Sequence, residues 1–166
     1  MDNAIEIKNL AKNFGKVKAI SNASFNIERG KITGYIGPNG AGKTTTINIL
    51  NGIIDKDEGE ISIFGEKYDK NSEKFKYKMG YVPESQYIYQ HLTLLEYLAF
   101  MGKIYNITKN ELREKIDHYL DFFELGSSKN SMISSLSKGN KQKLLIISGI
   151  LHDPDIIFFD EPMNGL

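Results

Sequence analysis

The stretch from Gly37 to Thr45 contains the residue types that bind a nucleotide phosphate. It reads G-P-N-G-A-G-K-T-T and fits the pattern G-x-x-x-x-G-K-[ST] of a phosphate-binding loop. Glycines let backbone N–H groups curl around phosphate oxygens, and a following helix adds the partial positive charge of its N-terminus. Lys43 can then reach the β- and γ-phosphates, and the Thr44 hydroxyl can ligate Mg²⁺. The nucleotide contacts that this pattern predicts are Asn39, Gly40, Ala41, Gly42, Lys43, Thr44 and Thr45.

A loop of this kind has to be held between a strand and a helix. Residues 32–36 (I-T-G-Y-I) form a short, mostly apolar run that favours a buried strand, and residues 45–50 favour the first turns of a helix. The alternative is an ordinary glycine-rich turn, which has no use for a lysine and a threonine at these positions. We therefore expect a strand, a glycine loop and a helix in this order.

A second group of residues near the end of the chain supplies carboxylates. The apolar run 156–159 is followed directly by Asp160 and Glu161. A buried strand over this run would place Asp160 near Mg²⁺ and the Thr44 hydroxyl. Glu161 would then lie on the γ-phosphate side, where a carboxylate can take a proton from the attacking water or orient it. The alternative is a pair of solvated acids at a strand end. We expect Thr44 and Asp160 to hold the metal, and Glu161 and Lys43 to serve catalysis.

Local patterns place strands towards both ends of the chain and helices between them. Apolar residues predict strands around 5–10, 19–27, 60–64, 79–82 and 156–159. The sequences T-L-L-E at Thr93 and T-K-N-E at Thr108 fit the capping box that opens a helix, and the second of these helices is expected to end near Gly126. A third helix is predicted over 139–151. This order predicts an α/β fold with a parallel-sheet nucleotide core and a helical insertion.

Composition excludes several kinds of chemistry. The 166 residues include 21 Lys and Arg and 21 Asp and Glu, so the formal net charge is zero and bulk electrostatics favour no nucleic-acid partner. There is no cysteine, which excludes disulfides, thiolate metal sites and cysteine nucleophiles. No apolar run approaches the roughly 18 residues of a membrane-spanning helix, so we expect any membrane role to come through a partner.

One further motif points to a family. Residues 136–143 read L-S-K-G-N-K-Q-K, which resembles the signature L-S-G-G-Q-x-Q-R of ATP-binding cassette (ABC) ATPases. The phosphate-binding loop (Walker A), this signature and the strand that ends in Asp160 (Walker B) follow one another in the family's order. Phe14 stands where the family has an aromatic residue that stacks on adenine, and residues 80–84 stand where it has its Q-loop. The resemblance covers essentially the whole chain.

The resemblance implies a P-loop NTPase core with N-terminal antiparallel β strands and an α-helical insertion subdomain, with ATP and Mg²⁺ as its ligands. We expect one incomplete domain over 1–166. Within it, the N-terminal β and P-loop core covers 1–83, the helical subdomain with the signature covers 84–152, and the Walker B strand covers 153–166.

In this family two ATP-binding domains meet head to tail, and each ATP lies between the P-loop of one and the signature of the other. The resemblance therefore adds further nucleotide contacts to those of the loop. They are Phe14, Glu84, Ser137, Lys138, Gly139 and Asn140. For Ser137 the alternative is a plain helix N-cap.

The chain departs from the family pattern at some of these positions. Lys138 replaces the first signature glycine, and Asn140 replaces the glutamine. If that glycine has a positive φ, a lysine is strained there; if φ is negative, the added ammonium helps to hold phosphate, and the sequence leaves both open. Glu84 stands where many members have glutamine, with Gln86 as the alternative occupant. The pair Pro83–Glu84 resembles exporters of drugs, antibiotics or peptides.

The sequence ends at Leu166, before the D-loop aspartate, the further strands and the switch histidine that the family has. We therefore expect a C-terminally truncated domain, in which the last strands of the sheet are missing. Such a chain is expected to bind nucleotide weakly and not to hydrolyse ATP at a useful rate.

As a function, the resemblance implies the ATPase subunit of an ABC exporter, held at the cytoplasmic face of the membrane by a transmembrane permease subunit. The alternatives are a soluble ABC ATPase without a permease, a P-loop kinase, and a fragment that only binds ATP or another subunit. The stretch between Lys43 and Ser137 is too short for the coiled-coil or zinc insertions of DNA-repair members, and a kinase does not explain the signature.

Tyrosines gather where the family meets its permease. Six of the nine lie between Tyr77 and Tyr105. For Tyr81 and Tyr97 we expect a packing role. For Tyr87 and Tyr89 we weigh contact with the permease equally against a half-buried surface, because an aromatic ring with a polar tip suits either place. 

Overall fold

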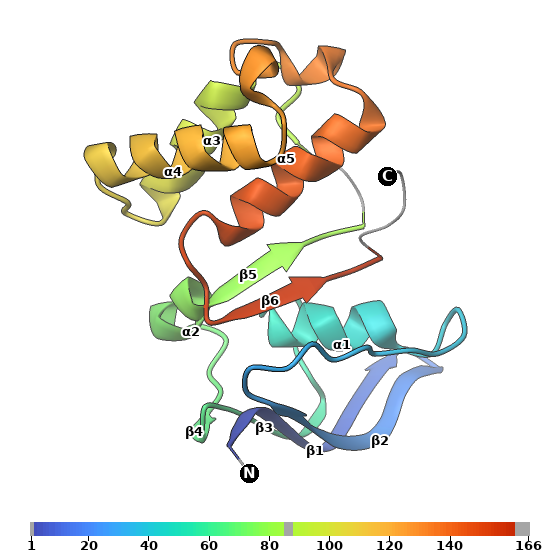
Figure 1. Ribbon diagram of the computed structural model, residues 1–166. Coiled ribbons are helices and arrows are strands. Elements are labelled where there is room, and N and C mark those ends of the chain that lie inside the picture. The colour runs from blue at the N-terminus through green and yellow to red at the C-terminus, as the bar shows by residue number, and fades with distance from the viewer. Residues whose placement is uncertain (1, 85–87, 162–166) are drawn as a thin grey trace. The chain divides into compact units, whose positions relative to one another are not determined.

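The computed structural model describes residues 2–84 and 88–161 (Figure 1). Its contacts divide the chain into two compact units, residues 1–76 and 77–166, which we name the N-terminal and the C-terminal unit. Helix α2, Glu73–Lys78, spans the boundary. The phosphate-binding loop therefore belongs to the N-terminal unit, whereas the expected signature and Walker B residues belong to the C-terminal unit.

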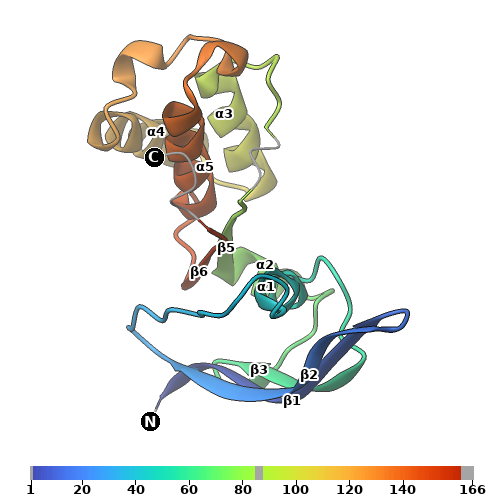
Figure 2. The same ribbon diagram turned by 90° about the vertical axis from the view of Figure 1, so that its right-hand side faces the viewer.

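The N-terminal unit contains a four-stranded antiparallel sheet with the strand order β2-β1-β3-β4. Its strands are β1 Asn3–Phe14, β2 Val17–Glu28, β3 Glu58–Ile63 and β4 Glu66–Lys67. Figure 2 shows helix α1, Lys43–Leu50, on one face of this sheet, where Ile49 and Leu50 are buried. The predicted strands at 5–10, 19–27 and 60–64 and the helix after the loop are confirmed, with boundaries shifted by a few residues.

A bulge in β1 explains the spacing of its buried residues. Ile5 and Ile7 point to the same face, as strand alternation requires, but the next buried residue is Leu10. The pairing with β2 shifts between Ile7 and Leu10, and Asn9 has a φ of 53°. The extra residue returns the side chain of Leu10 to the core face.

The predicted buried strand over 32–36 is wrong. Residues 31–38 are assigned to no strand, and Ile32 and Ile36 are exposed. Tyr35 keeps side-chain contacts, since its ring stacks on Phe25 with centroids 5.3 Å apart. A strand is stabilised by its neighbours, and within the described residues of the N-terminal unit the sheet of β1 to β4 does not include this segment. Apolar residues alone therefore did not suffice to make it a strand.

The C-terminal unit places helices on a pair of parallel strands. Strands β5 (Met79–Val82) and β6 (Ile156–Phe159) pair in register, with Val82 opposite Phe159. The connection contains α3 Leu94–Ile104, α4 Lys109–Phe122, the 3₁₀ turns η1 Gly126–Ser128 and η2 Ile133–Ser135, and α5 Lys138–Ile150. Parallel strands need such a crossover, and Figure 1 shows the helices gathered on one side of the pair.

Two glycines allow α5 to lie close against β5. A Cβ atom at Gly80 would collide with the carbonyl oxygen of Gly149, and one at Gly149 would lie 2.9 Å from Cγ2 of Val82. The core between the helices is formed by apolar residues at helical spacing, among them Leu94, Leu98, Leu120, Leu144 and Ile147. This packing fixes the two strand ends from which Glu84 and Asp160 continue.

The helix ends agree only in part with the sequence patterns. The capping box at Thr93 is confirmed, since its hydroxyl accepts from the Glu96 N–H and the Glu96 carboxylate accepts from the Thr93 N–H. Thr108 is the N-cap of α4, but its side chain makes no cap hydrogen bond in the part of the chain that is described. Helix α4 ends at Phe122 rather than near Gly126, because Glu124 turns the chain with a φ of 57°.

Candidate functional site

The phosphate-binding loop is shaped by glycines that no other residue could replace without strain. Gly40 and Gly42 have φ values of 81° and 84°, in the left-handed region. A Cβ atom at Gly42 would also collide with the carbonyl oxygen of Ala19 in β2. The Ala41 N–H donates to the Pro38 oxygen at 3.1 Å and closes the turn. The backbone thus requires glycine at Gly42, a fixed position of the pattern, and at Gly40, which the pattern leaves open.

Lys43 is the first residue of α1, and its ammonium lies against the loop. Its Nζ donates to the carbonyl oxygens of Gly37 at 2.8 Å and Pro38 at 3.0 Å. The first turn of α1 contains no acidic residue, and no side chain of the described residues caps the helix at Gly42. The positive end of the helix and the lysine therefore act on the same loop, an arrangement suited to a polyanion.

Thr46 is a part of this site that the sequence reading missed. It is buried, its hydroxyl donates to the Gly42 oxygen at 2.9 Å, and its N–H donates to the same oxygen at 2.8 Å. These bonds fasten the left-handed Gly42 to the first turn of α1. Spacing could have indicated it, because a threonine hydroxyl in a helix reaches the carbonyl four residues before it. Thr44 and Thr45 follow Lys43 in that turn, with Thr44 exposed and Thr45 half-buried.

Phe14 lies at the end of the β1–β2 hairpin, opposite Val17, and its side chain is 51% exposed. The contact between Gly42 and Ala19 brings the loop against β2 two residues beyond this pair. The hairpin end and the phosphate-binding loop thus lie side by side within the N-terminal unit. An exposed ring here is available for stacking, which is what the expected contact with adenine requires.

In the C-terminal unit, two carboxylates lie at one end of the β5–β6 pair. Parallel strands in register end at the same edge, and Asp160 and Glu84 follow these ends. The Asp160 N–H donates to the Val82 oxygen at 3.0 Å, and the Asp160 side chain is buried. Burial raises the pKa of Tyr81, and the charges of Asp160 and then Glu84 raise it further. Asp160 and Glu84 therefore both lie close enough to Tyr81 for their charges to act on it.

Glu161 is exposed and has a φ of 47°, so the chain turns sharply directly after Asp160. The two carboxylates thus leave the strand in different environments, Asp160 buried and Glu161 open to solvent. Gln86 and Tyr87, proposed from the sequence for the Q-loop and for a partner contact, lie outside the described residues.

The signature residues open helix α5. Ser137 is its N-cap, and its Oγ accepts from the Asn140 N–H at 3.2 Å. Lys138 is the first helical residue and is not among the described residues with positive φ, so the strained alternative for this position is excluded. The first turn of α5 has no acidic residue, and Gly139 is half-buried in it. Lys143 donates to the Phe123 oxygen at 3.0 Å and so caps α4.

The donors expected for Mg²⁺ lie in different units, Thr44 in the N-terminal and Asp160 in the C-terminal one. Among the residues that the structure describes, no three His, Asp or Glu side chains form a ready metal cluster. One carboxylate and one hydroxyl fit Mg²⁺, which prefers few protein ligands together with phosphate oxygens and water. No helix in the described ranges is long and apolar enough to span a bilayer.

Comparisons with known proteins show which family this chain is similar to. Residues 20–164 match the protein-family model described as ABC transporter. An uncharacterized ABC transporter ATP-binding protein of Methanocaldococcus jannaschii is 38% identical over 162 residues, which are 98% of this chain and 57% of that protein. The bacitracin transport ATP-binding protein of Bacillus licheniformis is 37% identical over 166 residues, the whole of this chain and 53% of that protein.

A solved structure of the ATP-binding subunit of an ABC transporter superposes with a TM-score of 0.88 at 32% identity, covering 98% of this chain and 68% of that one. The chain spans about half the length of the curated relatives it matches.

Proposed function

The chain belongs to the ABC transporter family of ATP-binding proteins, with the P-loop NTPase fold expected from its sequence, and from this premise we propose that it binds MgATP as part of the ATPase subunit of an exporter. The observation that carries the proposal is the loop itself. Its left-handed glycines, the ammonium of Lys43 and the uncapped end of α1 converge on one place in the N-terminal unit. That combination suits a triphosphate.

In this proposal Lys43 exchanges its bonds to the Gly37 and Pro38 carbonyls for bonds to the β- and γ-phosphates. The loop N–H groups take the remaining phosphate oxygens, and the exposed ring of Phe14 stacks on the adenine. Thr44 and Asp160 hold Mg²⁺, which would neutralise charge on the phosphates. Glu84 follows the same end of the β5–β6 pair as Asp160, and we propose that it also contacts the nucleotide.

Glu161 is proposed as the general base. Glu161 is exposed, whereas Asp160 is buried, and the Glu161 carboxylate can accept the proton of a water that attacks the γ-phosphorus. The N-terminus of α5, with Ser137, Lys138, Gly139 and Asn140, is proposed to receive the γ-phosphate of an ATP held by a second ATP-binding domain. Lys138 has no positive φ, so a lysine is not strained at this position. This supports a role for its ammonium in binding that phosphate.

The proposal of export rests on the relatives and on the pair Pro83–Glu84. Relatives include proteins named for bacitracin transport, linearmycin resistance and export of the SkfA peptide. We propose a permease partner for this chain, and an exposed aromatic pair on the C-terminal unit supports it. Tyr89 is 63% exposed and meets Phe100 of α3 edge to face, with centroids 5.7 Å apart. Tyr97, in contrast, is buried in the core and Tyr81 is half-buried.

We further infer that the 166 residues bind MgATP without steady turnover. The segment that leads into the loop, residues 31–36, is exposed and belongs to no strand among the described residues, so the sheet of the N-terminal unit does not hold this side of the loop. Chemistry at the γ-phosphate depends on positions held to within an ångström. Binding tolerates a looser loop than hydrolysis does.

Calorimetry with MgATP and a phosphate-release assay test both statements. We expect binding by the wild-type chain, loss of at least about tenfold in affinity for Lys43→Ala, and an unchanged affinity for Lys67→Ala, an exposed lysine of β4 that serves as the matched control. No MgATP binding, or equal effects of the two lysine variants, would refute the proposed site. Turnover that Glu161→Gln abolishes would refute the absence of hydrolysis while supporting the role of Glu161.

A further inference from the structure

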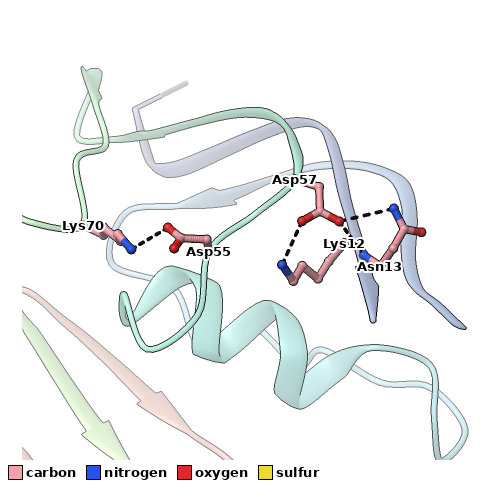
Figure 3. A network of polar contacts seen from close by, with 5 residues as sticks. All are labelled: Lys12, Asn13, Asp55, Asp57 and Lys70. Atoms are coloured by element: carbon pink, nitrogen blue, oxygen red, sulfur yellow. Dashed lines mark hydrogen bonds and ion pairs between the residues drawn. The ribbon is translucent and has the colours of Figure 1, made fainter. Parts of the chain in front are cut away.

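The end of the β1–β2 hairpin is fastened by a residue that lies far away in the sequence. Asp57 belongs to the connection between α1 and β3, and its carboxylate accepts from Lys12 Nζ at 2.8 Å, from the Asn13 N–H at 2.7 Å and from Asn13 Nδ2 at 3.3 Å (Figure 3). The Asp57 N–H donates to the Ala11 oxygen at 3.0 Å. Four bonds thus hold the last residues of β1 before Phe14.

Lys12 connects this carboxylate with the aromatic ring. Its ammonium, which bonds Asp57, lies 5.4 Å from the centroid of the Phe14 ring. The Lys12 side chain is only 13% exposed, so it is not a freely solvated surface lysine. A cation held near a ring restricts the orientations of that ring through its attraction to the π electrons. The Phe14 side chain nevertheless remains 51% exposed, which leaves ring surface for a ligand.

We propose that Asp57 and Lys12 are positioning residues for base recognition: they hold the ring of Phe14 in the orientation in which the adenine of ATP stacks on it. This inference rests on the proposed function, because it assumes that Phe14 meets the base. It adds a physical link within the N-terminal unit, since the connection that carries Asp57 leaves the same helix, α1, whose other end carries Lys43. The Phe14 ring, through Asp57, and the phosphate-binding loop, through Lys43, are thus connected to opposite ends of helix α1.

The competing explanation is that the ion pair only stabilises the sheet. The two explanations differ in which part of the nucleotide they affect. A positioning pair changes the affinity for MgATP and leaves the affinity for magnesium tripolyphosphate unchanged, since that ligand has no base. A loss of sheet stability lowers both affinities together or lowers neither.

Asp55 offers a matched control in the same connection. It is two residues before Asp57 and forms an ion pair with Lys70 at 2.5 Å, away from the hairpin (Figure 3). Asp55→Ala therefore removes the same charge and one ion pair from the same connection. Asp57→Asn provides a milder variant, because an amide oxygen still accepts from the Asn13 N–H while the charge facing Lys12 is lost.

The experiment is calorimetric titration of the full chain with MgATP and with magnesium tripolyphosphate, after circular dichroism has shown that each variant is folded. We expect Asp57→Ala and Lys12→Met to weaken MgATP binding by about three- to tenfold and to leave tripolyphosphate binding unchanged. Phe14→Ala should weaken MgATP binding about tenfold, and its combination with Asp57→Ala should add little more. Asp55→Ala should behave as wild type with both ligands.

The outcomes distinguish the positioning role of Asp57 and Lys12 from the proposed contact between Phe14 and adenine. If Phe14→Ala weakens MgATP binding while Asp57→Asn and Lys12→Met do not, the positioning role is wrong and the proposed base contact stands. If tripolyphosphate binding falls together with MgATP binding, the ion pair acts on the sheet and the positioning role is again wrong. If Phe14→Ala changes neither affinity, the base contact assigned to Phe14 is wrong, and the positioning role fails with it.

Discussion

The imidazole of His152 stacks on the phenol ring of Tyr105 with centroids 3.6 Å apart and planes within 4° of each other. His152 follows helix α5 and Tyr105 is the C-cap of α3, so the stack joins two helix ends of the C-terminal unit. The His152 Nε2 lies 3.1 Å from the carbonyl oxygen of Met79, the first residue of β5. With Nε2 as the donor, Nδ1 is an acceptor that is buried without a partner among the described residues.

This environment favours the neutral imidazole and predicts acid sensitivity of the C-terminal unit. Burial lowers the pKa of His152 below the ordinary histidine value of 6.5, the bond to Met79 and the charge of Asp153 oppose this effect, and Lys115 adds to it. A group whose folded pKa is depressed stabilises the fold above its unfolded pKa. The free energy of unfolding should therefore fall as the pH drops below about 6.5 towards the folded pKa.

His152→Phe keeps an aromatic ring for Tyr105 and removes the titrating nitrogens. Urea unfolding at pH 7.5 and 5.5 should show a loss of stability on acidification in the wild type and a smaller loss in the variant. An equal loss in both proteins would mean that protonation of His152 does not cause the loss of stability at low pH. His118 is exposed on α4, so His118→Phe serves as the control and should retain the wild-type dependence.

The glycines of the phosphate-binding loop predict a graded series of alanine substitutions. Gly40→Ala meets no atom within 4 Å but places a side chain at a φ of 81°, and we expect a cost of about 1–2 kcal/mol. Gly42→Ala adds a collision with the Ala19 carbonyl to the same strain, and we expect on the order of 3 kcal/mol. Gly126, which has open space around it and no positive φ, is the control.

Denaturant unfolding followed by circular dichroism measures this series. Gly126→Ala should change the free energy of unfolding by less than about 1 kcal/mol, with stabilisation as the favoured direction. Equal costs at Gly40 and Gly42 would show that the contact with Ala19 relaxes freely. In that case the loop would not be held against β2 as tightly as the backbone indicates.

The backbone at Lys138 predicts how Lys138→Gly, which restores the glycine of the family signature, changes the free energy of unfolding. Because Lys138 begins α5 without a positive φ, Lys138→Gly relieves no strain. Glycine has the larger conformational entropy in the unfolded chain, so we expect a loss of up to about 1 kcal/mol in the free energy of unfolding. A gain in stability would contradict the backbone described for this residue.

Local signals were sufficient where the sequence of an element itself carries a clear pattern. Strand β5 was predicted at 79–82 because an apolar run meets Pro83, and α5 was predicted within one residue of its observed ends. The glycine loop was found because the pattern has a glycine at Gly42, where the backbone is left-handed. The signals that predict these features lie within a few residues of one another, which is why periodicity and spacing reveal them.

Features that depend on distant residues were missed. The run 32–36 has the composition of a strand but no partner in the described sheet of its unit. The bonds of Asp57 to Lys12 and Asn13 join residues 45 and 44 positions apart, and no local pattern predicts such pairs. The end of α4 was misplaced because Gly126 is a better turn residue than Glu124, although the chain turns at Glu124.

The N-cap threonines of α3 and α4 provide a closely matched test of the capping boxes predicted from the sequence. Both fit the same four-residue pattern, but only Thr93 completes the box with its glutamate, whereas Thr108 makes no side-chain cap bond within the described part of the chain. Loss of an N-cap hydrogen bond costs about 1 kcal/mol. Thr93→Ala should therefore lower the free energy of unfolding of the C-terminal unit by about that amount, and Thr108→Ala should lower it by clearly less. Urea titration of the two variants beside the wild type measures this difference. Equal losses would mean that Thr108 forms its cap bond in solution, and the capping box read from the sequence would then hold at both helices.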